Sequence, residues 1–376
     1  MTSYIRDLGP SYGEATWRET QGLLEASDTI IGHIDTGVFP HATLGFAGET
    51  PPANILLDRG ANVYDPGGPK GAAPVTDLTI PNGALADFPD HGVKTLSIIL
   101  ANREGELRGV APGAKIIPYR VANGPVFLGE ARTGLIGRAM DHAMNDPVNA
   151  ANPPKVFTIS MGNPGFTGPT EFARLLVGGK PGMEAETTNA INDAYDRGII
   201  IVCAAGQVIN QIIYPARFGR TIAVGGIRQD ETHYPSGGYQ NSGEPDVWAY
   251  AANINRAAGH LEDGRIVQTH ADDPNSEDGE PSGTSYAAPQ VAAAAAMWVT
   301  RWSVELRALG APWKTVEAFR KALWLSSNVE NIKASPNSRR KINIRRLDID
   351  RLLRTPPDPH WALRERDRVS AALSWL

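Results

Sequence analysis

The sequence has little cysteine: Cys203 is the single one among 376 residues. No disulfide can form within the chain, and this usage is typical of a protein kept in a reducing compartment. The sequence also has no apolar run long enough for a secretory signal or a membrane-spanning helix. These absences predict a cytoplasmic protein without a membrane partner.

An excess of charge of one sign is missing as well. Lys and Arg number 36 against 41 Asp and Glu, which leaves a formal net charge of −5. A mildly acidic protein lacks the attraction that draws basic proteins to nucleic acids and anionic membranes. We therefore expect no nucleic-acid partner, and the composition leaves the oligomeric state open.

Glycine and proline are abundant instead, with 39 and 29 residues, together about 18% of the chain against roughly 12% in average proteins. This content predicts tight turns and long shaped loops, where binding and catalytic residues usually lie. Residues 50–90 and 255–283 are expected to be the longest loops. The second includes the acidic run 262–280, which we interpret as solvated. A structural calcium site there has no specific motif to support it.

Short apolar runs alternate with helical patterns from about residue 28 onward. The expected strands are 29–35, 114–121, 155–160, 199–204 and 221–224, and the expected helices are about 130–145, one ending at Gly198, one beginning at 289 and one at about 314–327. This rhythm predicts an α/β fold with three layers, a mostly parallel sheet with helices on both faces. Because parallel strands end at one edge, Asp35, Ser160 and Gly206 should lie on the same rim.

One domain is expected to take up most of the chain. We predict that it spans residues 28–354, with an N-terminal extension at 1–27 and a C-terminal tail at 355–376. A proline cluster at the start of the tail indicates a short linker to a last helix.

Ser285 is the candidate nucleophile. It stands in the segment 282–289 (SGTSYAAP), at the start of an alanine-rich helical pattern. A hydroxyl needs an adjacent base to attack a carbonyl group, and the unpaired N–H groups of a helix N-terminus can stabilise the resulting oxyanion. The alternative is that Gly-Thr-Ser is only a helix cap.

His91 and Asp35 are the candidate base and orienting acid. His91 begins a helical pattern, and a histidine titrates near physiological pH, so it can accept and return a proton. Asp35 ends a buried strand, where its carboxylate can hold the imidazole in one tautomer. The alternatives are a structural histidine at a helix start and a turn-forming aspartate before Thr36-Gly37. The other histidines, His33 among them, are left unassigned.

The three candidates occur in the order Asp, His, Ser, which is one of the three orders known for such a triad. The order and spacing of the α/β-hydrolases do not fit. Their serine is followed two positions later by glycine, and here that residue is Ala287. They also need a histidine after the serine, and His360, in the tail, is the only later one.

Five segments resemble motifs of the subtilases, a family of serine peptidases. They are IDTGV (34–38) for the aspartate motif, HGVK (91–94) for the histidine motif, GVAPGA (109–114) for the segment that follows it, SMG (160–162) for the edge that pairs with substrate, and GTSYAAP (283–289) for the serine motif. The resemblance runs from about residue 28 to 305. It implies a subtilisin-like fold and a serine endopeptidase whose catalytic triad is Asp35, His91 and Ser285.

The resemblance also implies how substrate binds. Ser160, Met161 and Gly162, with Ala205 and Gly206, would line the cleft, and a protein or peptide substrate would bind there as an added β-strand. The chemistry would need no metal or organic cofactor. Two alternatives stay open: a subtilase-fold scaffold that binds a partner without cutting it, and a peptide-tailoring enzyme or esterase with the same triad.

Three positions depart from the family pattern. Lys94 and Tyr286 stand where the family usually has histidine and methionine, outside the triad. Gln207 stands where the family has an asparagine whose side chain donates to the oxyanion. Gln207 has the same amide on an arm one methylene longer, and we expect it to donate beside the Ser285 N–H. If Gln207 failed to reach the oxyanion, the enzyme would be slow or selective.

Overall fold

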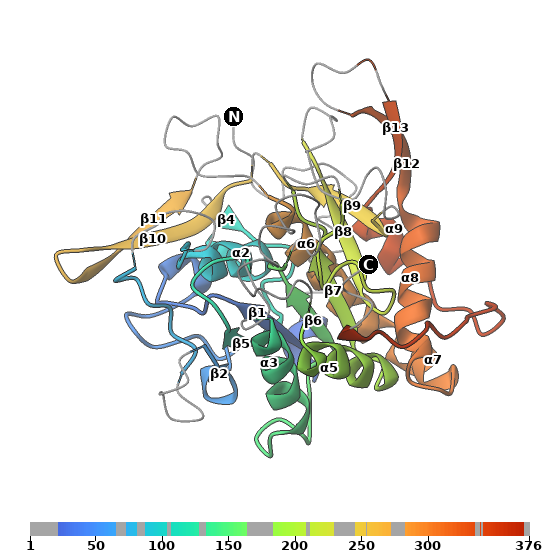
Figure 1. The fold of residues 1–376 in the computed structure, drawn as a ribbon, viewed down its shortest axis with the longest axis horizontal. Helices are drawn as coiled ribbons and strands as arrows, with labels where there is room; N and C mark the ends of the chain where they lie inside the picture. The colour runs from blue at the N-terminus through green and yellow to red at the C-terminus, as the bar shows by residue number, and fades with distance from the viewer. Residues whose placement is uncertain are drawn as a thin grey trace, which may run out of the picture.

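The computed structural model describes most of the chain, namely residues 22–64, 73–80, 87–103, 107–127, 133–163, 183–207, 211–228, 245–252, 254–271, 283–334, 339 and 341–371. Within these residues, nine strands form one sheet in the order β12-β13-β9-β8-β7-β6-β1-β5-β2 (Figure 1). These strands are β1 (Ile30–Asp35), β2 (Ala61–Asn62), β5 (Lys115–Arg120), β6 (Val156–Ile159), β7 (Ile200–Ala204), β8 (Ile222–Ile227), β9 (Val247–Tyr250), β12 (Asn328–Lys333) and β13 (Lys341–Arg346). Two small hairpins add β3 (Asn102–Arg103) with β4 (Leu107–Arg108), and β10 (Arg256–Glu262) with β11 (Arg265–Ala271).

The sheet is mostly parallel. β1 pairs in parallel with β5 on one side and β6 on the other, and β7, β8 and β9 continue the parallel order. Only the β12–β13 pair, at one end of this sheet as described, is antiparallel. The five predicted strands all form, close to their expected positions. The predicted α/β class with a mostly parallel sheet is confirmed.

Helices cover both faces of the sheet, which gives three layers (Figure 1). They are α2 (His91–Leu100), α3 (Gly134–Asn145), α5 (Ala185–Asp196), α6 (Thr284–Arg301), α7 (Ser303–Ala308), α8 (Lys314–Ser326) and α9 (Ile349–Leu353). Successive residues of β1 point to opposite faces. Ile31 belongs to the core cluster that contains α2 and α6 residues, whereas Ile30 and Ile34 belong to the cluster with α3 and α5 residues. A strand buried on both faces is therefore apolar almost throughout.

The helix α6 begins earlier than predicted. Its five consecutive alanines, 292–296, are fully buried, which confirms a tightly packed helix. The predicted start at 289 was wrong, because α6 begins at Thr284 and contains Pro289. A proline cannot donate to the carbonyl four residues before it. The Ser160 hydroxyl donates to that carbonyl of Ser285 instead, at 2.9 Å.

The prediction of a loop over residues 255–283 was wrong in its first half. Residues 256–271 form the antiparallel hairpin β10–β11, which projects from the body on the left of Figure 1. Its turn is Asp263-Gly264, with positive φ angles of 48° and 74°. An Asp-Gly pair favours this type of hairpin turn, so residues 263–264 carry a local signal for the hairpin within the acidic run. The rest of the acidic run, 272–280, lies outside the described residues.

The other expected loop, 50–90, is irregular over most of its described part. It contains one turn of 3-10 helix, Leu57–Arg59, and the two-residue strand β2 at the edge of the sheet. Residues 65–72 and 81–86 lie outside the described residues.

The predicted last helix of the tail is not formed where the structure describes the tail. Residues 362–370 are neither helix nor strand, and they run as an extended segment past α5. Hydrogen bonds from the body hold their main chain in that form. The predicted domain limits at 28 and 354 stay a prediction, and residues 1–21 and 372–376 lie outside the described part.

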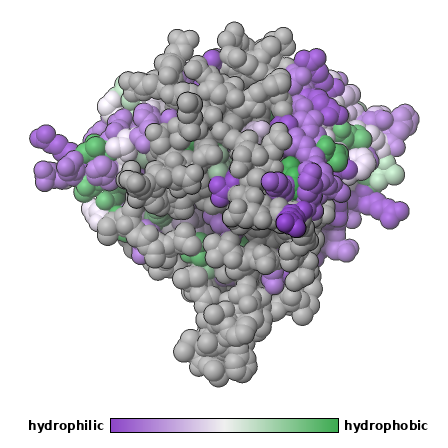
Figure 2. Space-filling model, turned by 90° about the horizontal axis from the view of Figure 1, so that it is seen from above, coloured by the Kyte–Doolittle hydropathy of each residue, from purple (hydrophilic) through white to green (hydrophobic). Residues whose placement is uncertain are grey.

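The described surface is ordinary in polarity. On the face shown in Figure 2, the coloured residues are mainly hydrophilic, and hydrophobic ones lie in small separate patches. Singly exposed apolar side chains such as Val304 and Val329 are common on folded proteins. Among the helices that the structure describes, none has both the length and the apolar character to cross a membrane.

Candidate active site

Asp35 lies at the carboxyl end of β1 and is completely buried. Its Oδ1 accepts hydrogen bonds from the Thr36 N–H at 2.8 Å and from His91 Nδ1 at 2.7 Å. Its Oδ2 accepts from the Thr95 hydroxyl at 3.0 Å. Both oxygens of this buried carboxylate are therefore satisfied, as a buried charge requires.

The surroundings of Asp35 favour its ionised form. Burial by itself would raise the pKa of Asp35, but the attraction and hydrogen bond of His91 and the Thr36 N–H outweigh it. The pKa of Asp35 is consequently below its ordinary value. His33, two residues earlier on β1 and on the same face, is neutral, because burial lowers its pKa to about 4. The carboxylate therefore faces two imidazoles, and only His91 is hydrogen bonded to it directly.

His91 is brought to Asp35 by the turn that follows β1. Gly92, the second residue of α2, donates its N–H to the Thr36 hydroxyl at 2.8 Å, and the same hydroxyl donates to the Pro89 carbonyl at 2.6 Å. A Cβ on Gly92 would lie 2.2 Å from the carbonyl oxygen of Gly37. Only glycine allows the helix start to approach the turn this closely, and this approach places His91 against Asp35.

Ser285 lies in the first turn of α6 and is paired with Ser160. The Ser285 hydroxyl donates to the Ser160 carbonyl at 2.9 Å, and the Ser160 hydroxyl donates to the Ser285 carbonyl at the same distance. Ser160 directly follows β6. The two reciprocal bonds thus tie the start of α6 to the carboxyl end of the sheet, the rim where Asp35 also lies.

Tyr286 links the serine segment to the histidine. Its ring centroid lies 6.2 Å from that of His91. The guanidinium carbon of Arg256, a fully buried residue of β10, lies 3.9 Å from the Tyr286 ring centroid. Within the described part of the chain, the three guanidinium nitrogens have no hydrogen-bond partner, so the aromatic ring is the main stabilising contact of this cation.

Lys94 is also buried beside His91. Its ammonium group lies 3.0 Å from Asp90 Oδ2 and 4.1 Å from the centroid of the Phe88 ring. The Phe88 ring in turn lies 6.4 Å from the His91 ring. Asp90 also accepts from the Gly259 N–H at 3.4 Å, so this group connects the histidine segment to the β10–β11 hairpin.

Gln207 lies directly against the serine segment. Its Oε1 accepts from both the N–H and the hydroxyl of Thr284, at 3.1 and 3.0 Å. Its Nε2 would lie 2.7 Å from a Cβ placed on Gly283. The oxygen end of the amide is therefore occupied by Thr284, and the nitrogen end lies at Gly283, two residues before Ser285.

The predicted substrate-binding residues have main-chain partners within the protein. The Gly162 N–H donates to the Pro125 carbonyl at 3.0 Å, and the Phe127 N–H donates to the Gly162 carbonyl at 2.9 Å. The Ala205 N–H donates to the Val224 carbonyl at 2.9 Å. Met161 is buried, as are Ser160, Ala205 and Gly206. The polar groups of Gly162 are thus already used by residues 125–127.

Sequence reasoning missed the threonines of the site. Thr95 lies one turn after His91 on the same side of α2, a spacing of four residues that a helix brings together. Thr284 connects Gln207 with the Gly206 N–H, to which its hydroxyl lies at 3.0 Å. Thr36 is part of the aspartate motif, but its hydrogen bond with the Gly92 N–H depends on the tertiary structure.

In the described residues, no group of three or more His, Cys, Asp or Glu could hold a metal ion.

Comparison with known sequences shows which protein family this chain matches. The sequence profile of the subtilase family matches residues 26–321. Subtilisin BL of Lederbergia lenta is 25% identical over 276 residues, which are 73% of this chain and 77% of that protein. The "Major intracellular serine protease" of Bacillus subtilis (strain 168) is 28% identical over 221 residues, 57% of this chain and 56% of that protein.

Two solved structures with a similar fold are named as proteases. One from Pseudoalteromonas arctica PAMC 21717 superposes with a TM-score of 0.65 at 20% identity and covers 94% of this chain and 98% of its own. The prenylagaramide maturation protease PagA gives a TM-score of 0.55 at 16% identity, with 91% and 98% covered. At these identities, the similarity shows the fold alone, and it agrees with the predicted subtilisin-like architecture.

Proposed function

This chain belongs to the subtilase family of serine peptidases, and from that premise we propose that it is an endopeptidase that cleaves peptide bonds with Asp35, His91 and Ser285. The observation that carries the proposal is the buried hydrogen bond of 2.7 Å between His91 Nδ1 and Asp35 Oδ1. It leaves the other ring nitrogen of His91, Nε2, as the proton acceptor.

The proposed reaction has two halves. Ser285 Oγ attacks the carbonyl carbon of the scissile bond while His91 Nε2 takes its proton, and the collapse of the tetrahedral intermediate breaks the C–N bond as His91 protonates the leaving amine. Water, deprotonated by His91, then attacks the acyl-enzyme and releases the second product with Ser285 regenerated. Asp35 stays ionised throughout and stabilises the imidazolium, which its low pKa supports.

The hydrogen bond of the Ser285 hydroxyl before substrate binds determines what has to happen first. Its single hydroxyl proton is donated to the Ser160 carbonyl, so the hydroxyl has to rotate toward His91 before attack. We propose that a bound substrate favours this rotation. The oxyanion is stabilised by the Ser285 N–H, which lies in the first turn of α6, and by Gln207 Nε2.

Residues Ser160–Gly162 and Ala205–Gly206 are proposed to bind a protein or peptide substrate as an added strand. Because the Gly162 main chain is paired with residues 125–127, a substrate strand on this edge has to displace that segment. A peptidase is favoured over a non-catalytic scaffold because the matched relatives are proteases by name.

Location and domain limits are proposals too. We propose a cytoplasmic enzyme with one peptidase domain at 28–354 that needs no metal for its chemistry. The buried, unpaired Cys203 supports a reducing compartment, and so does the similarity to a protease named as intracellular.

A fluorophosphonate probe tests the proposal, because it reacts with a serine only when a base activates it. The wild type should be labelled, and Ser285→Ala and His91→Ala should not, while all three show the same circular dichroism spectrum. Absence of labelling in the folded wild type, or labelling that survives in Ser285→Ala, would refute the proposed nucleophile.

A further inference from the structure

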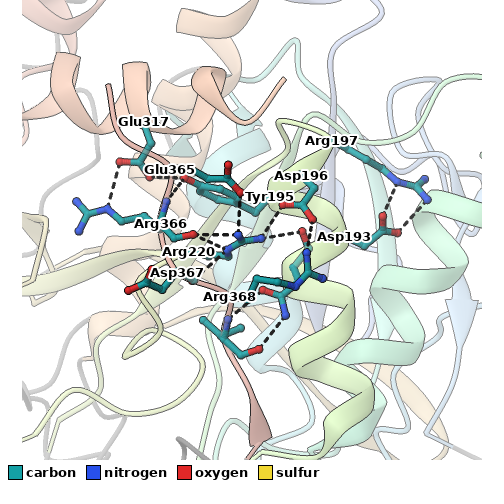
Figure 3. Close-up of polar contacts among 12 residues, drawn as sticks. Asp193, Tyr195, Asp196, Arg197, Arg220, Glu317, Glu365, Arg366, Asp367 and Arg368 are labelled. Atoms are coloured by element: carbon teal, nitrogen blue, oxygen red, sulfur yellow. Dashed lines mark hydrogen bonds and ion pairs between the residues drawn. The ribbon is translucent and has the colours of Figure 1, made fainter. Parts of the chain in front are cut away.

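The C-terminal segment 364–369 is bound by the body of the protein along its main chain (Figure 3). The side chains of residues 364–368 are exposed, and only Val369 is buried, at 8% exposure, in the core cluster with α3 and α5 residues. Exposed charged side chains contribute little to docking. The polar contacts that matter here are therefore those to peptide groups.

Arg220 is the centre of the contact. It is 1% exposed, and its Nε donates to the carbonyls of Arg366 and Asp367 at 3.2 and 3.1 Å, while its Nη2 donates to the Arg366 carbonyl at 2.9 Å. On its other side, Nη1 donates to Asp196 Oδ1 at 2.6 Å, and the Tyr195 ring centroid lies 4.4 Å from the guanidinium carbon. Figure 3 shows this guanidinium between Asp196 and the tail. The body thus holds Arg220 in place, and the tail carbonyls complete its hydrogen bonds.

Asn192 and Tyr195 of α5 bind two further peptide groups. The Asn192 amide, 2% exposed, donates to the Val369 carbonyl at 2.8 Å and accepts from the Val369 N–H at 3.0 Å. The Tyr195 hydroxyl accepts from the Arg366 N–H at 3.0 Å and donates to Glu317 of α8 at 3.1 Å. Asn192 thus pairs with the tail main chain as a neighbouring strand would, and Tyr195 binds one more N–H. The tail side chains add ion pairs of Glu365 with Arg220 at 3.2 Å, Arg366 with Glu317 at 3.3 Å and Arg368 with Asp196 at 2.8 Å.

The position of this contact separates it from the catalytic site. Asn192 and Tyr195 are in the last turns of α5, which leads into the start of β7, and Arg220 lies two residues before the start of β8. The contact therefore lies at the amino ends of the parallel strands. Asp35 ends β1 and Ser160 directly follows β6, so residues 364–369 are held at the opposite ends of the strands from the catalytic rim.

We propose that Arg220, Asn192 and Tyr195 form a second peptide-binding site, distinct from the catalytic one, that recognises an extended main chain with one apolar side chain, and that residues 364–369 of this chain occupy it. Without the segment, the donors of Arg220 and Asn192 that bind its carbonyls would face water, and the apolar contact of Val369 would be lost. An empty site should accordingly accept the same peptide as a separate molecule.

The test uses the full chain with Ser285→Ala, so that no peptide is cleaved and the result does not depend on the proposed activity. A second substitution, Val369→Asp, puts a charge where the apolar side chain is buried and releases the tail. Calorimetric titration with the peptide RERDRVSA, residues 364–371, should then show one site. The Ser285→Ala chain with its native tail should bind this peptide at least about tenfold more weakly, because its site is filled.

Modified peptides separate main-chain from side-chain recognition. Methylation of the Val369 nitrogen removes the N–H group that donates to the Asn192 side chain, and this change should weaken binding about tenfold. A peptide with both Glu365→Ala and Arg368→Ala should bind within about threefold of the original, since exposed ion pairs contribute little. Failure of the original peptide to bind a folded Val369→Asp chain, or equal binding of the methylated peptide, would overturn the proposal.

Hydrogen exchange in the full Ser285→Ala chain gives an answer even if Val369→Asp does not fold. The amides of Arg366 and Val369, which donate to Tyr195 and Asn192, should exchange slowly, and those of Asp367 and Arg368 quickly. Asn192→Ala should remove the protection at Val369. Fast exchange at Val369 in the native chain would contradict a bound tail.

Discussion

His91 Nδ1 and Asp35 Oδ1 lie 2.7 Å apart, and neither side chain is more than 3% exposed. In a dry environment, this hydrogen bond fixes the ring orientation and the tautomer of the imidazole. The neighbouring bonds from Thr36 and Thr95 keep the carboxylate oriented in turn.

Asp35→Asn should lower kcat on the order of 10⁴-fold and leave KM within a few-fold, because an amide cannot stabilise the imidazolium. Steady-state kinetics on a peptide substrate would measure it. Thr95→Val is the matched control: it removes a donor to the other oxygen of Asp35 and should cost far less. A loss of similar size in both variants would mean that orientation of the carboxylate by its donors, and not its charge, is what matters.

Gly92→Ala should both destabilise the fold and slow the reaction. The added methyl group would lie 2.2 Å from the Gly37 carbonyl oxygen, and relieving such overpacking costs about 1–3 kcal/mol. The shift also moves His91 from Asp35, so kcat should fall by roughly 10²-fold. Gly219→Ala, where a Cβ meets nothing within 4 Å, should change neither the melting temperature nor kcat. Unchanged kcat in Gly92→Ala would disprove the positioning role.

Gln207→Glu tests the role of the amide oxygen of Gln207 separately from the role of its amide N–H. The glutamate keeps an oxygen for the two Thr284 donors but loses the N–H that we assign to the oxyanion. We expect kcat to fall by about 10²–10³-fold with little change in KM. Full activity in this variant would leave Gln207 with only the structural contact to Thr284.

The shorter Gln207→Asn variant is the companion measurement. It retains the amide but on an arm that reaches less far toward Thr284. If donation to the oxyanion is the main role, Gln207→Asn should retain more activity than Gln207→Glu, and pre-steady-state acylation rates would show the difference.

His33 should make the protein less stable in mild acid. Burial holds its pKa at about 4, well below the value of 6.5 that it has when exposed. Between these values the unfolded chain binds a proton and the folded chain does not, so stability falls as the pH drops from about 6.5 to 4, by on the order of 3 kcal/mol. Urea unfolding of wild type and His33→Gln across this window should show a smaller slope for the variant.

Asp35 acts in a different pH window. Its pKa is lowered in the folded state, so its stabilising contribution is present above about 4 and is lost below it. The His33→Gln variant should therefore still unfold in strong acid. Identical slopes for both proteins between pH 6.5 and 4 would contradict a neutral, buried His33.

Phe127→Leu should make the substrate edge easier to open. Phe127 is buried, and its N–H holds the Gly162 carbonyl that a substrate strand would use. Binding of a peptide aldehyde to the wild type should include a slow step whose rate does not depend on inhibitor concentration, and the smaller side chain should speed that step. Simple one-step binding in both proteins would show that substrate pairs elsewhere.

Much of the fold could be read from local patterns. The run IIVCA is apolar throughout, and in IIGHID only His33 and Asp35 are polar, because strands of a parallel sheet are buried on both faces. The start of α6 was misplaced because proline favours the first turn of a helix, and here Pro289 is tolerated further in. The Ser285 carbonyl, which Pro289 leaves without a helical donor, accepts from the hydroxyl of Ser160, 125 positions before Ser285 in the sequence.

The C-terminal tail shows even more clearly that tertiary contacts can override a local pattern. Its composition, with Ala, Leu, Arg and Glu, favours a helix, but the main chain of Arg366 and Val369 is bound by Arg220, Tyr195 and Asn192. Local propensity is worth a few tenths of a kcal/mol per residue, and several hydrogen bonds to buried side chains outweigh it.

The sequence by itself determined the order Asp35, His91, Ser285 and the alternation of strands and helices that puts chemical groups at one rim, because apolar periodicity and motif spacing are local properties. Only the tertiary structure decided that His91 bonds to Asp35, that Ser285 rests on Ser160, that Gly162 is paired with residues 125–127, and that the tail docks on α5. Each of these contacts joins segments far apart in the chain. Their geometry follows from close packing of the whole fold, which no local pattern contains.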